Sequence, residues 1–133
     1  MIGLDTNVVL RLLLTDDPAQ KMRATKLIQQ AKRLDTRIIV TLAVVLEMEW
    51  VLRSSAKMTK AQTMSVFDLL LESYDIEIEN EKVLEQALHI YANAAADFAE
   101  CLFLAQYQRM GCDRMMTFDT KAARMAGVEL VAS

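Results

Sequence analysis

The chain begins with the stretch MIGLDTNVVL, residues 1–10, in which a short apolar run gives way to an aspartate, a threonine and an asparagine. A short apolar run bounded by polar turn formers is typical of a buried strand. We therefore expect a strand over Met1–Asp5, with Asp5 at its carboxyl end. This position is informative because the ligands of open α/β sheets gather beyond the carboxyl ends of the strands.

Short apolar runs of the same kind recur along the chain and are separated by longer stretches with helical periodicity. This alternation predicts an α/β fold in which helices cover a central parallel sheet of about five strands. The further strands are expected over Arg37–Thr41, Asp75–Ile78, Asp113–Phe118 and Val128–Val131.

Residues typical of helix ends mark the helical segments. Asp17 supplies an N-cap and Pro18 a first helical residue, which predicts the start of a helix. We expect this helix to end near Leu34. Gly111 predicts the end of another helix, because glycine readily adopts the left-handed conformation found there. The remaining helices are expected over Ala43–Ser54, Thr59–Ser73, Asn80–Ala94, Phe98–Met110 and Thr120–Ala126.

The length and composition suit one globular domain, which we expect to span residues 1–133. The start lacks a basic leader, and the longest apolar run, Ile38–Leu46, is about half as long as a bilayer crossing requires. A cytoplasmic protein is therefore expected. The net charge is −3, but residues 1–66 carry ten Lys and Arg against six Asp and Glu. This basic half has two interpretations, a phosphate-binding surface or a solvated helix face.

Three acidic residues occupy positions where α/β proteins bind ligands. Asp5 closes the first predicted strand, Asp119 follows the fourth, and Glu47 lies on the helix that leaves the second. For Asp5 and Asp119 the alternative interpretation is simple helix capping, since aspartate is a preferred N-cap residue.

Glu47 and Glu49 have different expected roles although they are two residues apart on one helix. That spacing places them about 200° apart around the helix, so they cannot share a face. Glu49 has Arg53 four residues later, the preferred order for a helical ion pair. Glu47 has only apolar neighbours at these spacings, and we expect its carboxylate to be desolvated and to need a metal ion or hydrogen bonds.

Asp97 and Glu100 form a second pair of carboxylates. They are three residues apart at the start of a predicted helix, hence on one face and close enough to hold one ion together. The same spacing is that of a capping box, with aspartate as the N-cap and glutamate at the third helical position. Both interpretations remain open at this point.

Taken together, these carboxylates predict a divalent-cation site. Four or five carboxylates at the same end of one sheet would repel each other unless a cation neutralised them. Oxygen ligands favour Mg²⁺ or Mn²⁺ over zinc. The two cysteines, Cys101 and Cys112, lie in no CxxC or Cys/His arrangement, which argues against a structural zinc site.

Four segments together resemble the PIN domains, and within them the VapC-type toxins of toxin–antitoxin systems. The resemblance covers essentially the whole chain and implies a three-layer α/β/α domain. Each segment alone is weak evidence for the resemblance, but the four occur in the family's order and spacing. They are the opening strand with Asp5-Thr6-Asn7, the segment Glu47-Met48-Glu49-Trp50-Val51-Leu52, the segment Asp97-Phe98-Ala99-Glu100-Cys101-Leu102 and Thr117-Phe118-Asp119.

The resemblance implies a Mg²⁺- or Mn²⁺-dependent endoribonuclease that hydrolyses RNA phosphodiester bonds. It implies catalytic roles for Asp5, Glu47, Asp97, Glu100 and Asp119, metal ligation by Asp5, Asp97, Glu100 and Asp119, and orienting hydrogen bonds from Thr6, Asn7 and Thr117. The chain departs from the family at position 100, where aspartate is usual. Asp97 is one helical turn earlier and can share or replace that role. The resemblance also implies a homodimer and a VapB-like antitoxin.

Two rival functions share part of this pattern. The haloacid-dehalogenase-like phosphatases also have an aspartate after the first strand, but they need a second aspartate two residues later, where this chain has Asn7. The other rival is a catalytically inactive PIN-fold module that binds RNA or a partner protein. Glu100 favours this interpretation. The other candidate carboxylates count against it, namely Asp5, Glu47, Asp97 and Asp119.

Overall fold

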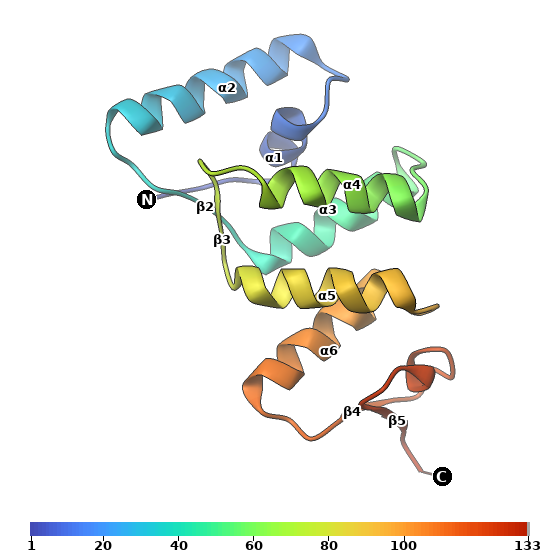
Figure 1. Ribbon diagram of the computed structural model, residues 1–133. Helices are drawn as coiled ribbons and strands as arrows, with labels where there is room; N and C mark the ends of the chain where they lie inside the picture. The colour runs from blue at the N-terminus through green and yellow to red at the C-terminus, as the bar shows by residue number, and fades with distance from the viewer. Residues whose placement is uncertain (133) are drawn as a thin grey trace. The chain divides into compact units, whose positions relative to one another are not determined.

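The computed structural model describes residues 1–132, and Ser133, the last residue of the expected domain, lies outside the described part. The chain divides into two compact units, Met1–Glu79 and Asn80–Ser133. Both units combine helices with parallel strands (Figure 1), which confirms the expected α/β class. None of the described helices is long and apolar enough to span a bilayer.

The first unit contains a parallel sheet of three short strands and four helices in its described residues. The order in the sheet is β1-β2-β3, with Ile2 opposite Ile38 and Val40 opposite Ile78. In chain order the elements are β1 (Ile2–Gly3), α1 (Thr6–Leu13), α2 (Pro18–Arg33), β2 (Ile38–Val40), α3 (Leu42–Ser54), α4 (Lys60–Leu71) and β3 (Glu77–Ile78).

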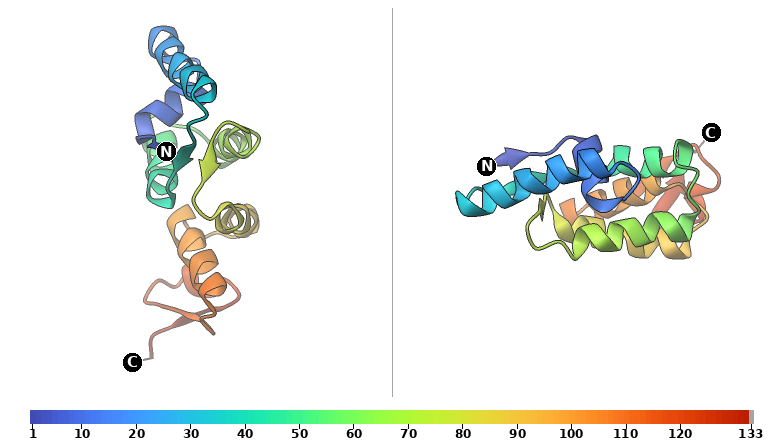
Figure 2. Two further views of the ribbon diagram at one scale, coloured as in Figure 1. Left: turned by 90° about the vertical axis from the view of Figure 1, so that its left-hand side faces the viewer. Right: turned by 90° about the horizontal axis from the view of Figure 1, so that it is seen from above.

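Helix α1 is central to the packing of this unit. It contacts α2, α3 and α4, and Figure 2 shows α2 lying alongside it. Val9 of α1, Val45 of α3 and Phe67 of α4 are completely buried. Each such side chain contributes about 1.5–3 kcal/mol relative to an exposed one, so α1 is fixed by its apolar face.

The second unit is built on a helix pair. The helices α5 (Glu81–Asn93) and α6 (Phe98–Met110) pack against each other, and Tyr91 and Phe98 meet edge to face at 5.5 Å between ring centroids. The strands β4 (Met115–Thr117) and β5 (Val128–Leu130) pair in parallel, with the 3₁₀ helix η1 (Ala122–Arg124) between them in the chain.

All five expected strands are present, but the described residues pair them as one sheet of three and one of two. The expected helices are also found, except that Thr120–Ala126 contains only the short 3₁₀ helix η1. Helix α1 was foreseen only through the capping interpretation of Asp5. Its β-branched residues Val8 and Val9 resemble a strand in the sequence, and burial of its apolar face outweighs that weak preference.

Candidate functional site

Asp5 lies between β1 and α1 and is the N-cap of α1. Its Oδ1 accepts a hydrogen bond from the backbone N–H of Thr6 at 2.7 Å. Within residues 1–132, Oδ2 has no hydrogen-bond donor, and Asp5 is exposed. The capping interaction therefore fixes the side chain through one oxygen and leaves the other available to a ligand.

The two residues that follow Asp5 differ in their surroundings. Thr6 is buried, with 3% of its surface exposed, whereas Asn7 is exposed on the first turn of α1. The backbone of Thr6 positions the Asp5 carboxylate, because its N–H is the donor to Oδ1. A role of the Thr6 and Asn7 side chains in orienting the acidic residues stays a prediction.

The structure corrects the expected burial of Glu47 on α3. Glu47 is exposed, so the expectation that its carboxylate is desolvated was wrong. Glu49 is the buried residue, with 3% of its surface exposed, and Nε of Arg53 donates to its Oε1 at 2.8 Å. The predicted ion pair between Glu49 and Arg53 is confirmed. The apolar residues one helical turn from Glu47 are themselves exposed or half-buried, with Trp50 57% exposed, so they do not desolvate its carboxylate.

A further carboxylate near the first sheet was missed by the sequence reasoning. Glu79 follows β3, and its Oε1 accepts a hydrogen bond from the N–H of Leu42 at 3.0 Å. Together with Thr41, which accepts from the N–H of Val44, it caps the start of α3. Nothing in the sequence signals this contact, because Glu79 and Leu42 are brought together only by the pairing of β2 with β3.

Asp97 and Glu100 begin α6 as a capping box. The N–H of Asp97 donates to Oε2 of Glu100 at 3.2 Å, as the capping interpretation predicted. Asp97 is exposed and Glu100 is half-buried. Glu100 is thus folded back onto the start of its own helix.

Asp119 occupies the turn between β4 and η1. Its Oδ1 accepts from the N–H of Ala122 at 2.9 Å, and its own N–H donates to Oγ1 of Thr117 at 3.0 Å. As with Asp5, the other carboxylate oxygen has no donor among the described residues. Asp5 and Asp119 therefore have the same arrangement: each follows a parallel strand and each is fixed by one oxygen.

The candidate residues are distributed over both units. Asp5, which caps α1, and Glu47, which lies on the neighbouring helix α3, belong to Met1–Glu79. The other three candidate residues belong to Asn80–Ser133. Within residues 1–132 no group of three or more His, Cys, Asp or Glu side chains is placed to hold a metal ion. The metal site thus stays a prediction.

The donors themselves suit a hard divalent cation. All five candidate side chains offer carboxylate oxygens, the ligands that Mg²⁺ and Mn²⁺ prefer. In the described part of the chain none of the five forms an ion pair, whereas Asp16, Glu49, Asp75, Glu77 and Glu129 each pair with Lys or Arg. Their negative charge is therefore not neutralised by a basic side chain.

Comparison with known proteins assigns the family. The sequence matches the PIN domain over residues 2–128, a range that includes Asp5, Glu47, Asp97, Glu100 and Asp119. The chain belongs to the PIN domain family. The expected α/β PIN fold is thereby confirmed, and the match extends over both compact units of this PIN domain.

Among solved structures, this PIN domain is similar to VapC20 of Mycobacterium tuberculosis, a Sarcin-Ricin loop cleaving toxin. The two share 16% identity over 97% of this chain and 98% of that chain, with a TM-score of 0.41. VapBC2 from Rickettsia felis, bound to a DNA fragment from its promoter, also shares 16% identity, over 98% of each chain, with a TM-score of 0.40. Both TM-scores are too low to carry a functional comparison. A search of curated proteins found no match.

Proposed function

We propose that this PIN domain is a Mg²⁺- or Mn²⁺-dependent endoribonuclease and the toxin of a toxin–antitoxin pair. The observation that carries the proposal is the family match over residues 2–128, which includes all five candidate carboxylates. The similarity of four segments to VapC-type toxins supports the narrower assignment. Asp5, Asp97, Glu100 and Asp119 would hold the ion, with Glu47 as the remaining acidic residue of the site.

Backbone N–H groups orient two of these proposed metal ligands, Asp5 and Asp119. Thr6 N–H holds one oxygen of Asp5 and Ala122 N–H holds one oxygen of Asp119. Each carboxylate is fixed without a cationic partner, so ligation of a metal need not break an existing ion pair. A bound Mg²⁺ or Mn²⁺ supplies a water of lowered pKa and positive charge near the leaving oxygen of the phosphodiester.

The proposed partners follow from the same assignment. A VapB-like antitoxin would cover part of the surface, and the protein would act in the cytoplasm as a homodimer. Exposed large apolar residues on the first unit are compatible with a protein partner, since Met22 is 60% exposed, Trp50 57% and Leu69 49%.

Cleavage of labelled RNA tests the proposed activity. Purified, antitoxin-free protein with Mg²⁺ or Mn²⁺ is expected to give discrete fragments, and EDTA or the substitution Asp5→Asn is expected to abolish them. Asp113→Asn is the matched control, because Asp113 is an exposed aspartate outside the site. Intact RNA under all conditions, from protein shown to be folded, would refute the proposed activity.

A catalytically inactive binding module is the second candidate. The hydrogen bond from Asp97 N–H to Glu100 favours it, because it turns the glutamate toward the helix start. The two candidates differ in their response to metal. Stabilisation by Mn²⁺ that disappears in Asp5→Asn supports the enzyme, and a melting temperature indifferent to Mn²⁺ supports the module.

A further inference from the structure

A cavity of about 360 Å³ lies between α1 and α2 in the first unit. Asn7, Val8 and Arg11 line it from α1, and Gln20, Arg23 and Leu27 are among the lining residues from α2. Two of these side chains are cationic and no carboxylate lines the cavity. Val8, Ala24 and Leu27 give the cavity an apolar lining and its charged groups are arginines. This combination suits an anion with an attached organic group.

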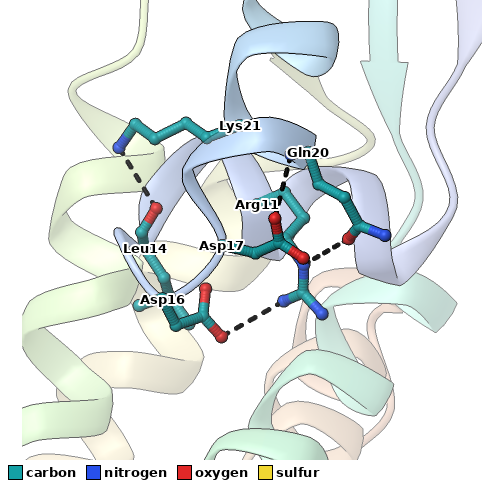
Figure 3. Close-up of polar contacts among 6 residues, drawn as sticks. All are labelled: Arg11, Leu14, Asp16, Asp17, Gln20 and Lys21. Atoms are coloured by element: carbon teal, nitrogen blue, oxygen red, sulfur yellow. Dashed lines mark hydrogen bonds and ion pairs between the residues drawn. The ribbon is translucent and has the colours of Figure 1, made fainter.

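Arg11 is held in one orientation at this cavity. Its Nε donates to Oε1 of Gln20 at 2.6 Å, and one terminal nitrogen donates to Oδ2 of Asp16 at 3.3 Å. Figure 3 shows the guanidinium group between these two acceptors, at the turn that joins α1 to α2. A guanidinium has five N–H donors, so the two contacts leave other donors for a ligand.

Arg23 supplies the second charge. It follows Gln20 by three residues on α2, which places both on the same face of the helix. Arg23 is exposed and has no ion pair within residues 1–132. Unlike Arg11, it therefore has its full charge available to a bound anion.

The cavity is close to Asp5 along the chain. Asn7, which lines it, is two residues after Asp5, and Arg11 is six residues after, or about 9 Å along the helix axis. A polynucleotide strand bound at Asp5 and running along α1 would therefore place a neighbouring phosphate at this cavity.

We propose that Arg11 and Arg23 bind a phosphate of the RNA strand next to the bond that is cut. The inference rests on the proposed function. Arginine suits this task because its planar fork binds two phosphate oxygens at once. Arg11 is held by Gln20 and Asp16 and provides a contact of fixed orientation. Arg23 is exposed and can adjust its position to the phosphate. The basic residues noted in the first half of the sequence thus include a specific substrate contact.

Binding of a labelled single-stranded RNA in EDTA, measured by fluorescence anisotropy on the full chain, tests this inference. Arg23→Gln is expected to weaken binding about three- to tenfold and to reduce the slope of log K against log salt by about 0.7. Arg11→Lys keeps the charge but loses the fork, and we expect weaker binding with little change in the slope.

Arg33→Gln is the matched control. Arg33 is exposed on the same helix, has no ion pair among the described residues, and lies about 15 Å further along the axis. Equal weakening by Arg23→Gln and Arg33→Gln would overturn the inference, because it would show only a general charge effect. Competition by polyglutamate as effective as that by unlabelled RNA would also overturn it and indicate a site for an acidic protein.

Failure of this inference is distinguishable from failure of the proposed function. If metal-dependent cleavage is seen but binding is unaffected by Arg23→Gln, the activity stands and the phosphate contact is refuted. If no cleavage is seen but Arg23→Gln selectively weakens RNA binding, the nuclease is refuted, and Arg23 remains a phosphate contact to bound RNA with no bond that is cut beside it.

Discussion

The two glutamates on α3 have different roles: one stabilises the fold and the other is available for chemistry. Glu49 is buried and accepts a hydrogen bond from Arg53, whereas Glu47 is exposed and has no ion pair in residues 1–132. Their 200° separation was predictable from helix geometry, and so was the partner of Glu49. Which of the two faces the core was not, because the apolar residues of α3 extend around much of the helix.

The substitution Glu49→Gln is expected to lower the free energy of unfolding by about 1–2 kcal/mol, since it removes a charged hydrogen bond from a buried position. Glu47→Gln is expected to leave stability within about 0.5 kcal/mol and to reduce RNA cleavage. Urea denaturation of both variants, paired with the cleavage assay, measures the two effects. Equal destabilisation by both substitutions would contradict these separate roles.

At the scale of elements, local signals predicted the ends of helices well. Asp17 caps α2 through a 3.0 Å bond to the N–H of Gln20, and Gly111 ends α6 with φ +90°. Asp97 and Glu100 form the capping box that their spacing suggested. The pairing of β2 with β3 and the cap that Glu79 gives to α3 depend on contacts between distant residues, which local patterns do not encode.

Gly111→Ala tests one of these ends. Because alanine is strained at positive φ, we expect a loss of about 1–2 kcal/mol in the free energy of unfolding. Gly3→Ala is the control, since Gly3 has no positive φ and an added Cβ would meet nothing within 4 Å. If thermal or urea unfolding shows the same loss of unfolding free energy for both variants, the role given to the left-handed conformation of Gly111 at the end of α6 is contradicted.

At the scale of the whole molecule, the candidate site draws on distant parts of the sequence. The carboxyl ends of β1 and β4 supply Asp5 and Asp119, and the start of α6 supplies Asp97 and Glu100. Sequence reasoning could find each residue from its position after a strand or at a helix start. Such local signals carry no information on the distances between these residues, which belong to two compact units.

The most direct test of the central claim is a calorimetric titration of the full chain with Mn²⁺, repeated on Asp5→Asn and Asp119→Asn. The account predicts saturable binding to the unaltered protein and a loss of at least tenfold in affinity for each variant, although the two residues belong to different units. Asp113→Asn should bind as the unaltered chain does. Unchanged Mn²⁺ affinity in both site variants would contradict a metal centre built from these carboxylates.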